Sequence, residues 1–317
     1  MNVRSLRAGL AFAAPWLAGF VLLTFGPLLA SAVISLTRWD GLTGQVEYVG
    51  LEHYRTILAL DATGSAPRGD PRFVRAVTNS LIYTGMAVPL GLAVSLSLAL
   101  LLNVPLRGIT VFRTIIYLPY VLSGVATILM FQWLFNPDFG LVNAVLRSLA
   151  QAVQPFARFI GFDITGWIPP RWFYSEFWCK PALVLMSLFN TGGATLIFLA
   201  SLQDVPHDQL DAANIDGAGW WRRFRAVTLP HISPALLFNL LIGILSAMQA
   251  FNQAYLLSHY TQRDGLLLYV LYLYQRAFED YQFGYAAALS WILFAMLLVI
   301  SGLLLRSSRR WVYYAAH

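Results

Sequence analysis

Six long stretches of this chain contain no Asp, Glu, Lys or Arg, and each is long enough to cross about 30 Å of hydrocarbon as an α-helix. Across the whole chain 58% of the residues are hydrophobic and only 11% are charged, whereas about a quarter of the residues in soluble domains are charged. We therefore predict an all-α, polytopic membrane protein with about six transmembrane helices. The predicted spans are residues 9–36, 77–102, 115–135, 181–202, 235–256 and 283–305.

The first stretch follows Arg4 and Arg7, as the apolar core of a secretory signal would. Its uncharged run is much longer than the roughly 7–15 residues of a signal core, so we interpret it as a retained helix. Pro15 and Pro27 lie inside this helix and predict a kink.

Arginines in the short loops predict the orientation, because basic residues near the ends of spans resist translocation. They fall on one side of the predicted membrane, at Arg4, Arg7, Arg107, Arg113, Arg222, Arg223, Arg225, Arg306, Arg309 and Arg310. This side is predicted to be the cytoplasm, so both termini would be cytoplasmic and loops 37–75, 136–180 and 257–282 would lie outside. The net charge of +6 mostly reflects this asymmetry, and nucleic acid is not an expected partner.

The sequence argues against several kinds of chemistry. Lys180 is the only lysine and Pro181 follows it, so a Walker-type phosphate-binding loop cannot form. The absence of charged residues from the predicted spans weakens an ion-coupled mechanism without excluding it. The five histidines lie in loops or at span ends without a visible nucleophile partner, so we expect neither an enzyme nor a catalytic residue. The single cysteine, Cys179, excludes an internal disulfide and a Cys-rich cluster, and we predict no metal site or cofactor in this chain.

The loop between predicted spans four and five, residues 203–234, is unlike the others. Pro206 suits the first turn of a helix, and Asp208 lies where the positive end of the helix dipole favours an acid. We expect Gly217 to end this short helix, because glycine readily adopts the left-handed conformation of a helix terminus.

A second amphipathic helix is predicted over residues 220–229, with Pro230 stopping it before span five. Its apolar face would carry Trp220, Phe224 and Val227, and its polar face Arg222 and Arg225. The alternative is a basic helix resting on anionic lipid. We favour a protein-docking element, because lipid binding requires neither the Asp-Gly turn nor the alanine pair that precedes it.

The same loop resembles the cytoplasmic signature of binding-protein-dependent ABC import permeases, which reads Glu-Ala-Ala, then Gly-Ala, then Pro. The matching positions are Asp211, Ala212, Ala213, Asp216, Gly217, Ala218, Phe224 and Pro230. In that family the signature forms a coupling helix that seats in a cleft of the ATPase subunit. The resemblance implies that Asp211 meets a basic residue of the ATPase, that the two alanines permit close approach, and that Gly217 makes the turn. Asp211 replaces the usual glutamate and is one methylene shorter.

The wider resemblance covers nearly the whole chain and is to the carbohydrate branch, the maltose-type and glycerol-phosphate-type permeases. Residues 36–41, 49–54 and 136–143 are similar to that branch in order and spacing. Residues 258–265 depart from its Gly-Gly-Pro-like run. We expect either a docking surface for the binding protein or an interfacial aromatic belt in the second outer loop, at Trp167, Pro169, Pro170, Trp172, Phe173 and Tyr174.

The resemblance implies a type I ABC importer permease fold in one transmembrane domain, residues 1–317, with its core at about 75–306. The implied function is translocation of a sugar or sugar-like solute across a bacterial or archaeal inner membrane. The implied partners are a second homologous permease, two ATPase subunits that hold ATP and Mg²⁺, and an extracytoplasmic solute-binding protein. The alternative is an ion-coupled or passive solute carrier.

Two polar clusters within the predicted spans are candidates for the substrate path. In span five, Gln249, Asn252 and Gln253 follow i, i+3, i+4 spacing, and Tyr255 lies close by. Amides and aromatic rings suit sugars, so for this cluster we favour a path over hydrogen bonds that hold helices together. In span four, Asn190 and Thr191 precede Gly192 and Gly193, and there we favour a structural role, either close packing or a break in the helix.

Overall fold

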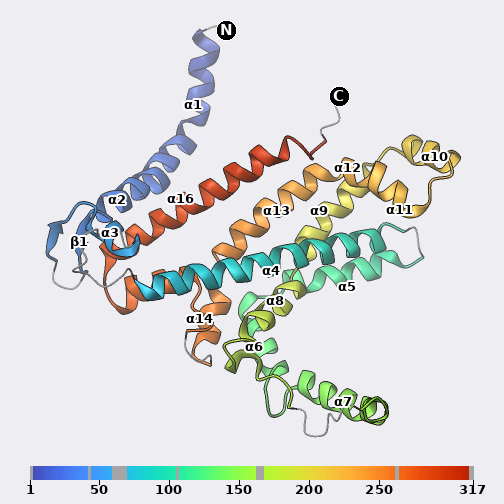
Figure 1. The fold of residues 1–317 in the computed structure, drawn as a ribbon. Coiled ribbons are helices and arrows are strands. Elements are labelled where there is room, and N and C mark those ends of the chain that lie inside the picture. The colour runs from blue at the N-terminus through green and yellow to red at the C-terminus, as the bar shows by residue number, and fades with distance from the viewer. Residues whose placement is uncertain are drawn as a thin grey trace. The chain divides into compact units, whose positions relative to one another are not determined.

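The computed structural model describes residues 3–41, 44–58, 70–104, 107–161, 168–260 and 264–313 (Figure 1). The chain divides into two compact units. The smaller unit comprises Met1–Phe73 and Tyr272–Val299, and the larger one comprises Val74–Leu271 and Ile300–His317.

The described chain is mostly helical and has one short β-hairpin, which confirms the predicted all-α fold class. Four helical segments are long and apolar enough to span a membrane: Phe12–Ile34, Pro71–Leu102, Ser233–Ser258 and Phe283–Ser308. Two further spans form if each of two bent helix pairs counts as one: Ile109–Val121 with Gly124–Leu134, and Cys179–Phe189 with Gly192–Gln203.

The third predicted span, residues 115–135, is bent. Helix α5 (Ile109–Val121) and helix α6 (Gly124–Leu134) meet at 96°. Pro119 lies in the last turn of α5, and Leu122 has an extended conformation with ψ 149°. The proline ring and the extended residue end the helix, and Ser123 starts the next one. Helix α8 (Cys179–Phe189) and helix α9 (Gly192–Gln203) meet at 50°, across Asn190 and Thr191.

The smaller unit begins with helices α1 (Val3–Phe20) and α2 (Gly26–Ile34), joined by the π-helical turn η1 (Val21–Phe25). The wide turn directly precedes Pro27, and the N–H of Gly26 bonds to Val21 five residues back. Strands β1 (Thr37–Trp39) and β2 (Val46–Tyr48) then form an antiparallel hairpin in which Thr37 pairs with Tyr48. Helix α3 (Glu52–Leu58) follows.

The hairpin packs closely on the start of helix α16 (Phe283–Ser308). A Cβ on Gly284 would lie 1.9 Å from the Thr37 carbonyl oxygen, so only glycine fits there. The same carbonyl lies 3.0 Å from Nε2 of His53 on α3. Residues 36–41 and 49–54, which carry part of the family resemblance, therefore form one packed corner.

A half-buried ionic cluster completes the smaller unit. Asp70 accepts hydrogen bonds from the hydroxyls of Tyr272 and Tyr285, pairs with Arg276 at 3.1 Å, and caps helix α4 (Pro71–Leu102) through the N–H of Arg72. Burial alone would raise the pKa of Asp70, but the two tyrosine hydrogen bonds and the guanidinium outweigh burial and hold the pKa below its usual value. Burial and the bond to Asp70 raise the pKa of Tyr272 to about 12. Arg276 belongs to the π-helical turn η4 (Gln275–Glu279), which follows α15 (Tyr269–Tyr274).

The larger unit contains the remaining helices. After α6 come α7 (Leu141–Phe159), the 3₁₀ turn η2 (Trp172–Tyr174), α8 and α9, then α10 (His207–Ile215), α11 (Trp220–Arg223), the π-helical turn η3 (Phe224–Thr228), α12 (Leu229–His231), α13 (Ser233–Met248) and α14 (Asn252–Ser258). A buried apolar cluster joins α4, α9 and α13, and consists of Ala99, Leu102, Phe198, Leu199, Leu202, Val205, Ile232 and Ala235.

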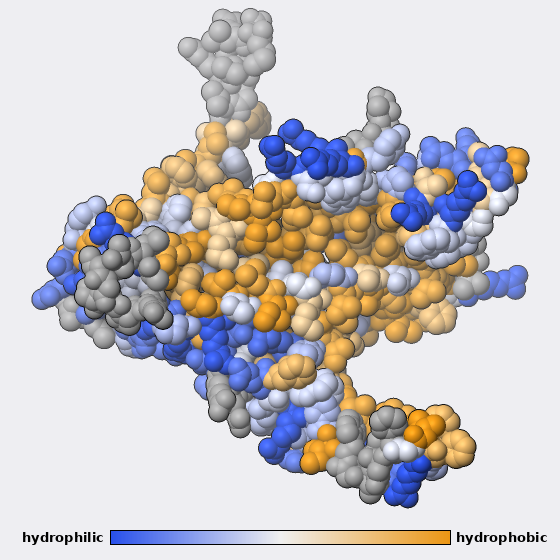
Figure 2. All heavy atoms as spheres, viewed as in Figure 1, coloured by the Kyte–Doolittle hydropathy of each residue, from blue (hydrophilic) through white to orange (hydrophobic). Residues whose placement is uncertain are grey.

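Many large apolar side chains of the larger unit remain exposed, including Leu101, Val111 and Phe112, each more than half exposed. In Figure 2 apolar residues cover much of the visible surface, and hydrophilic ones gather over α10 and α11. Apolar exposure on this scale is unusual for a soluble protein and suits lipid as the solvent.

Candidate functional site

The α10–α11 loop (residues 203–234) contains the short helix and the glycine turn that the sequence predicted. Pro206 is the N-cap of α10, and Gly217 has φ +70° in the left-handed region. The N–H groups of Gly217 and Ala218 bond to the carbonyls of Asn214 and Ala213, both at 3.0 Å. These two bonds form a Schellman motif, which satisfies the end of the helix and fixes the direction of the turn.

The outward side of α10 contacts nothing else in the described part of the chain. None of its residues is buried, and Asp211 and Ala212 are exposed. Asp216 is also exposed, while Ala213 and Ala218 are half-buried. Ile215 is 87% exposed, which is high for an apolar residue at the tip of an ordered turn. The α10–α11 loop therefore presents an exposed surface of small, acidic and apolar groups.

The second half of the loop differs from the prediction at its end. The helix does not stop at Pro230 but runs through the π-helical turn η3 into α12, which contains Pro230. In the π turn the N–H of Leu229 bonds to Phe224, five residues back. This wider turn accommodates a proline that would distort a regular α-helix. The helical path breaks instead at Ile232, which has ψ 0°.

An aromatic cluster lies between the turn and the bundle. The rings of Trp220 and Trp221 both stack on Phe224, with centroids 5.7 Å apart in each case. Both tryptophans remain more than 60% exposed, and Phe224 is half-buried. Arg222 is exposed, whereas Arg223 hydrogen-bonds the side chain of Asn214 and so ties α11 to α10.

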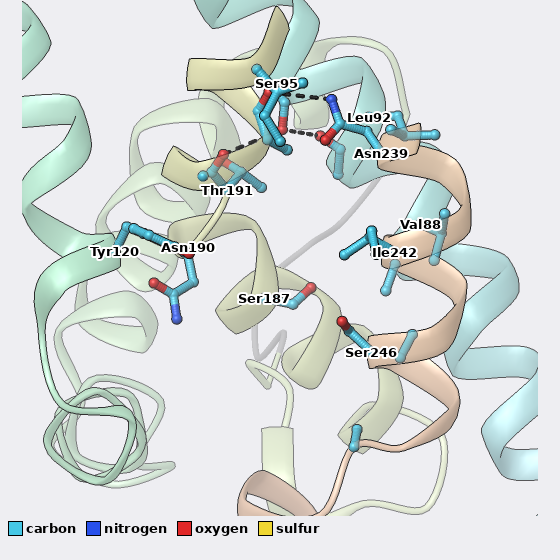
Figure 3. A pocket seen from close by; sticks show the side chains of 18 of the residues that line it. Val88, Leu92, Ser95, Tyr120, Ser187, Asn190, Thr191, Asn239, Ile242 and Ser246 are labelled. Atoms are coloured by element: carbon cyan, nitrogen blue, oxygen red, sulfur yellow. Dashed lines mark hydrogen bonds between the residues drawn. The ribbon is translucent and has the colours of Figure 1, made fainter. Parts of the chain in front are cut away.

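A cavity of about 470 Å³ lies within the larger unit. It is partly open and is lined by α4, the end of α5, the break between α8 and α9, and α13. Figure 3 shows Tyr120 reaching from α5 toward Asn190, and Ser187 facing Ser246 across the space. The volume is in the range typical of small-molecule sites.

The lining of the cavity is mostly apolar, contains several polar groups and carries no charge. Among its described lining residues there is no Asp, Glu, Lys, Arg or His. The polar groups are amides, hydroxyls and phenols from Tyr83, Ser95, Tyr120, Ser187, Asn190, Thr191, Asn239, Ser246 and Gln253. Such groups can both donate and accept hydrogen bonds.

Part of this polar lining is engaged in holding the helices together. The Ser95 hydroxyl on α4 lies 3.5 Å from the Thr191 carbonyl at the start of α9, and the Asn239 amide on α13 donates to the Ala194 carbonyl on α9 at 3.4 Å. The hydroxyls of Ser95 and Thr195 also bond within their own helices, to the carbonyls of Gly91 and Thr191. These bonds fix the upper wall around α9 and leave the amides nearer the break for a ligand.

The two glycines of span four seat an aromatic ring at the cavity. A Cβ on Gly192 would lie 2.9 Å from Cβ of Tyr120, and a Cβ on Gly193 would lie 2.9 Å from its ring. Tyr120 is nevertheless 55% exposed and lines the cavity. The break of span four therefore packs against α5 just before the break of span three.

The structure separates the predicted substrate-path residues into two groups. Asn190, Thr191 and Gln253 line the cavity, whereas Gln249, Asn252 and Tyr255 do not. The expected helical spacing fails because α13 ends at Met248 and α14 begins at Asn252. The intervening Phe251 has φ −124°, and its ring stacks on Tyr255 at 5.3 Å.

Six polar lining residues are not among the candidates that the sequence predicted: Tyr83, Ser95, Tyr120, Ser187, Asn239 and Ser246. They lie singly or in pairs within apolar runs and form no cluster in the sequence. Uncharged spans that contain an isolated Asn are uncommon enough to have served as a signal.

The proposed aromatic docking surface is not available as predicted. Trp172 and Phe173 are buried, 7% and 1% exposed, and both rings pack against Phe135. Pro169 is also buried. Trp167 lies outside the described residues, as do residues 261–263 of the unusual loop after span five.

Helices that cross a membrane, a neutral polar cavity at broken spans and an exposed loop hairpin define a membrane permease. Residues 62–312 match the family described as binding-protein-dependent transport system inner membrane component, and the chain belongs to this family. It is thus a multi-pass inner membrane protein and the permease component of an ABC importer. This favours an ATP-driven importer over an ion-coupled or passive carrier.

Curated relatives and solved structures agree with this assignment. A probable ABC transporter permease protein of Bacillus subtilis, YesP, is 34% identical over 98% of this chain and 94% of its own length. The lactose transport system permease protein LacF of Rhizobium radiobacter is 30% identical over 95% and 94%. A permease chain in the crystal structure of a bacterial alginate ABC transporter, in complex with alginate pentasaccharide-bound periplasmic protein, superposes with a TM-score of 0.76. The two chains are 21% identical, and the superposition covers 97% of this chain and 96% of that one.

Proposed function

We propose that this permease imports a neutral sugar or oligosaccharide through the cavity between α4, α5, α8–α9 and α13. The observation that carries the proposal is the lining, which offers hydroxyls, amides and an aromatic ring but no charged side chain among the described residues. Sugars are recognised by hydrogen bonds to their hydroxyls and by aromatic packing on their faces. An acidic sugar would leave its carboxylate without a cationic partner in a site of low dielectric constant. Relatives named for lactose and for arabinooligosaccharides support a sugar substrate.

The energy would come from a separate ATPase that docks on the α10–α11 loop. Asp211, Ala212, Ala213, Asp216, Gly217, Ala218, Arg222, Phe224 and Pro230 are the proposed coupling residues. The exposed face of α10 supports this role, because only Leu210 of this short helix packs on the buried cluster and the other side is free for a partner. ATP and Mg²⁺ would bind in the ATPase and not in this chain.

The proposed assembly contains this chain, a second homologous permease, two ATPase subunits and a solute-binding protein outside the membrane. Both termini and the α10–α11 loop would face the cytoplasm of a bacterial or archaeal cell. Loading of the binding protein and closure of the ATPase dimer would then move the loop and open the cavity to alternate sides.

Uptake in proteoliposomes tests the cavity. The full complex is reconstituted with its binding protein, and uptake of neutral sugars is compared with uptake of a uronic acid oligosaccharide. Asn190→Leu and Gln253→Leu should reduce uptake about tenfold or more, because each removes an amide aimed at the cavity and introduces an apolar group. Complex assembly should be unchanged.

Gln249→Leu is the matched control, since Gln249 lies beside the same break but not on the cavity. Normal uptake by Gln249→Leu with impaired uptake by Asn190→Leu supports the cavity. The reverse pattern would support the path predicted from helical spacing and exclude this cavity as the route.

A further inference from the structure

Helix α7 is the most amphipathic segment of the chain, and neither the cavity nor the α10–α11 loop involves it. At 100° per residue, one half of the helix carries Leu141, Val142, Val145, Leu146, Leu149, Val153 and Phe156. The other half carries Asn143, Arg147, Ser148, Gln151, Gln154 and Arg158. The helix contains no Asp or Glu. Helix α7 thus has one apolar face and one polar face, and its basic residues lie on the polar face.

The apolar half of α7 lies exposed in the described structure. Leu149 is 55%, Val153 50% and Phe156 65% exposed. Figure 1 shows α7 projecting away from the other helices of the larger unit. A helix that leaves this much apolar surface uncovered needs another phase or another molecule against it.

The first turns of α7 are fixed to the spans. Asn143 is 1% exposed, and its amide donates to the carbonyls of Pro137 and Pro170, both at 3.2 Å. Its Oδ1 accepts a hydrogen bond from Nε1 of Trp172 at 2.8 Å, close to the start of α8. The buried amide therefore ties α7 to the chain on both sides of it.

The connection from α6 to α7 is short and tightly turned. Only residues 135–140 separate the two helices, and a Cβ on Gly140 would lie 2.4 Å from the Asn136 carbonyl oxygen. Because α6 ends a predicted span, α7 must begin where that span leaves the hydrocarbon. The helix is thus held at the boundary between membrane and water.

We propose that α7 lies in the headgroup region of the membrane, with its apolar face on the acyl chains and its arginines toward the phosphates of anionic phospholipids. Arg147 and Arg158, without any acid in the helix, complement a negatively charged lipid surface. The division into a strongly apolar and a basic face is the pattern of interfacial helices. A protein partner fits less well, because the apolar face contains neither Trp nor Tyr, the residues that dominate protein interfaces.

The position of α7 in the headgroup region sets the depth of α6, the second half of span three, in the membrane. Helix α6 joins α5 at the bend beside Tyr120, so an anchor at its far end fixes one arm of the broken span while the other arm moves. The proposal is independent of the sugar and of the ATPase, and it holds for any solute that the permease carries.

Site-directed spin labelling of the full chain, assembled with its partner subunits, tests the proposal. The buried Cys179 is first replaced by alanine, and single substitutions Val153→Cys and Phe156→Cys place labels on the apolar face. Ser148→Cys and Gln151→Cys are the matched controls on the exposed polar face. Labelled complexes are reconstituted in phosphatidylethanolamine bilayers that contain phosphatidylglycerol.

We expect the labels at 153 and 156 to collide several-fold more often with oxygen, which concentrates in acyl chains, than with a water-soluble nickel chelate. The labels at 148 and 151 should show the reverse. Equal access of the chelate to all four sites would place α7 in water and overturn the proposal. Protection of 153 and 156 from both reagents only when the binding protein is added would also overturn it, and would identify a protein interface.

The lipid charge gives a second arm. Without phosphatidylglycerol, or with Arg147→Gln and Arg158→Gln combined, the oxygen preference at 153 should fall. The unlabelled Val153→Cys thiol provides a check that does not depend on the spin label. It should react more slowly with a water-soluble maleimide than the Gln151→Cys thiol does, and equal rates would contradict the proposed orientation.

Discussion

Replacement of Gly217 tests the coupling proposal most directly, because the structure separates its conformational cost from any packing cost. Gly217 has φ +70°, and a Cβ there would meet no atom within 4 Å. Gly217→Ala therefore adds backbone strain alone, about 1–2 kcal/mol for a non-glycine residue in the left-handed region. In the α10–α11 loop this cost lowers the ratio of the correct turn to other conformations by a factor of roughly 5–30. Gly217→Asn should cost less, and Gly217→Val should cost more.

The assay is substrate-stimulated ATP hydrolysis and uptake by the reconstituted complex, together with co-purification of the ATPase. Gly217→Asn should keep the most activity, Gly217→Ala less and Gly217→Val the least, while the thermal stability of the bundle stays constant. Gly219→Ser is the matched control, since Gly219 has φ −63°, caps α11 and also has open space around it. Serine is a good N-cap residue, so this variant should behave like the wild type. Full coupling and normal ATPase association in Gly217→Val would refute the role of the turn.

Three other substitutions test contacts in the two units. Asp70→Ala should destabilise the purified protein by about 1–3 kcal/mol at neutral pH, because it removes the acceptor of the Tyr272 and Tyr285 hydroxyls and one of the two acids that pair with Arg276. The pKa of folded Asp70 lies below its usual value, so this stabilisation is fully present above pH of about 4 and is lost as the pH falls through the folded-state pKa. Unfolding curves of wild type and variant should therefore converge in acid. Gly284→Ala should unfold the β1–β2 corner, since its Cβ would lie 1.9 Å from the Thr37 carbonyl oxygen. Gly302→Ala is the control on the same helix, because its Cβ would meet no atom within 4 Å. In thermal melts this control should be neutral or stabilising by up to about 1 kcal/mol. Gly193→Ala should displace the Tyr120 ring and change the KM for uptake more than it changes assembly, and an unaltered KM would show that the ring does not contact substrate.

The sequence predicted features that depend on local physics. Charge-free runs identified the spans, because hydrocarbon tolerates neither charges nor unpaired backbone groups. The turn at Gly217 was also predictable from local physics, because glycine readily adopts the left-handed backbone conformation that ends a helix.

Features that depend on where a helix breaks were not predictable. The path through Gln249 and Asn252 assumed an unbroken helix, but the helix is interrupted between Met248 and Asn252. Pro119 lies in the last turn of α5, but a proline alone does not predict a bend of 96°. We expected Pro230 to stop the helix, but the π-helical turn η3 accommodates this proline and the helix continues into α12. In each case the backbone path depends on tertiary packing, which local sequence signals do not specify.

The α10–α11 loop and the cavity share two helices, and this connection gives the coupling a physical route. Helix α9 runs from the break at the cavity to the start of the loop, and α13 runs from the end of the loop back to the cavity wall. Where both helices meet the loop, Leu202, Val205 and Ile232 are buried together, each 5% exposed or less. A displacement of α10 must therefore move α9 and α13 as one packed body.

Ile232→Ala tests this route, because it opens a hole between the two helices without touching either the cavity or the exposed face of α10. We expect a loss of about 2–5 kcal/mol in stability and a larger loss of uptake than of basal ATP hydrolysis. Ile128→Ala is the matched control, since Ile128 on α6 is 2% exposed and lies outside the cluster. It should lower stability by a similar amount while uptake and hydrolysis stay in proportion. Equal ratios in the two variants would show that the cluster only stabilises the bundle, and force from α10 would then have to reach the cavity by another path.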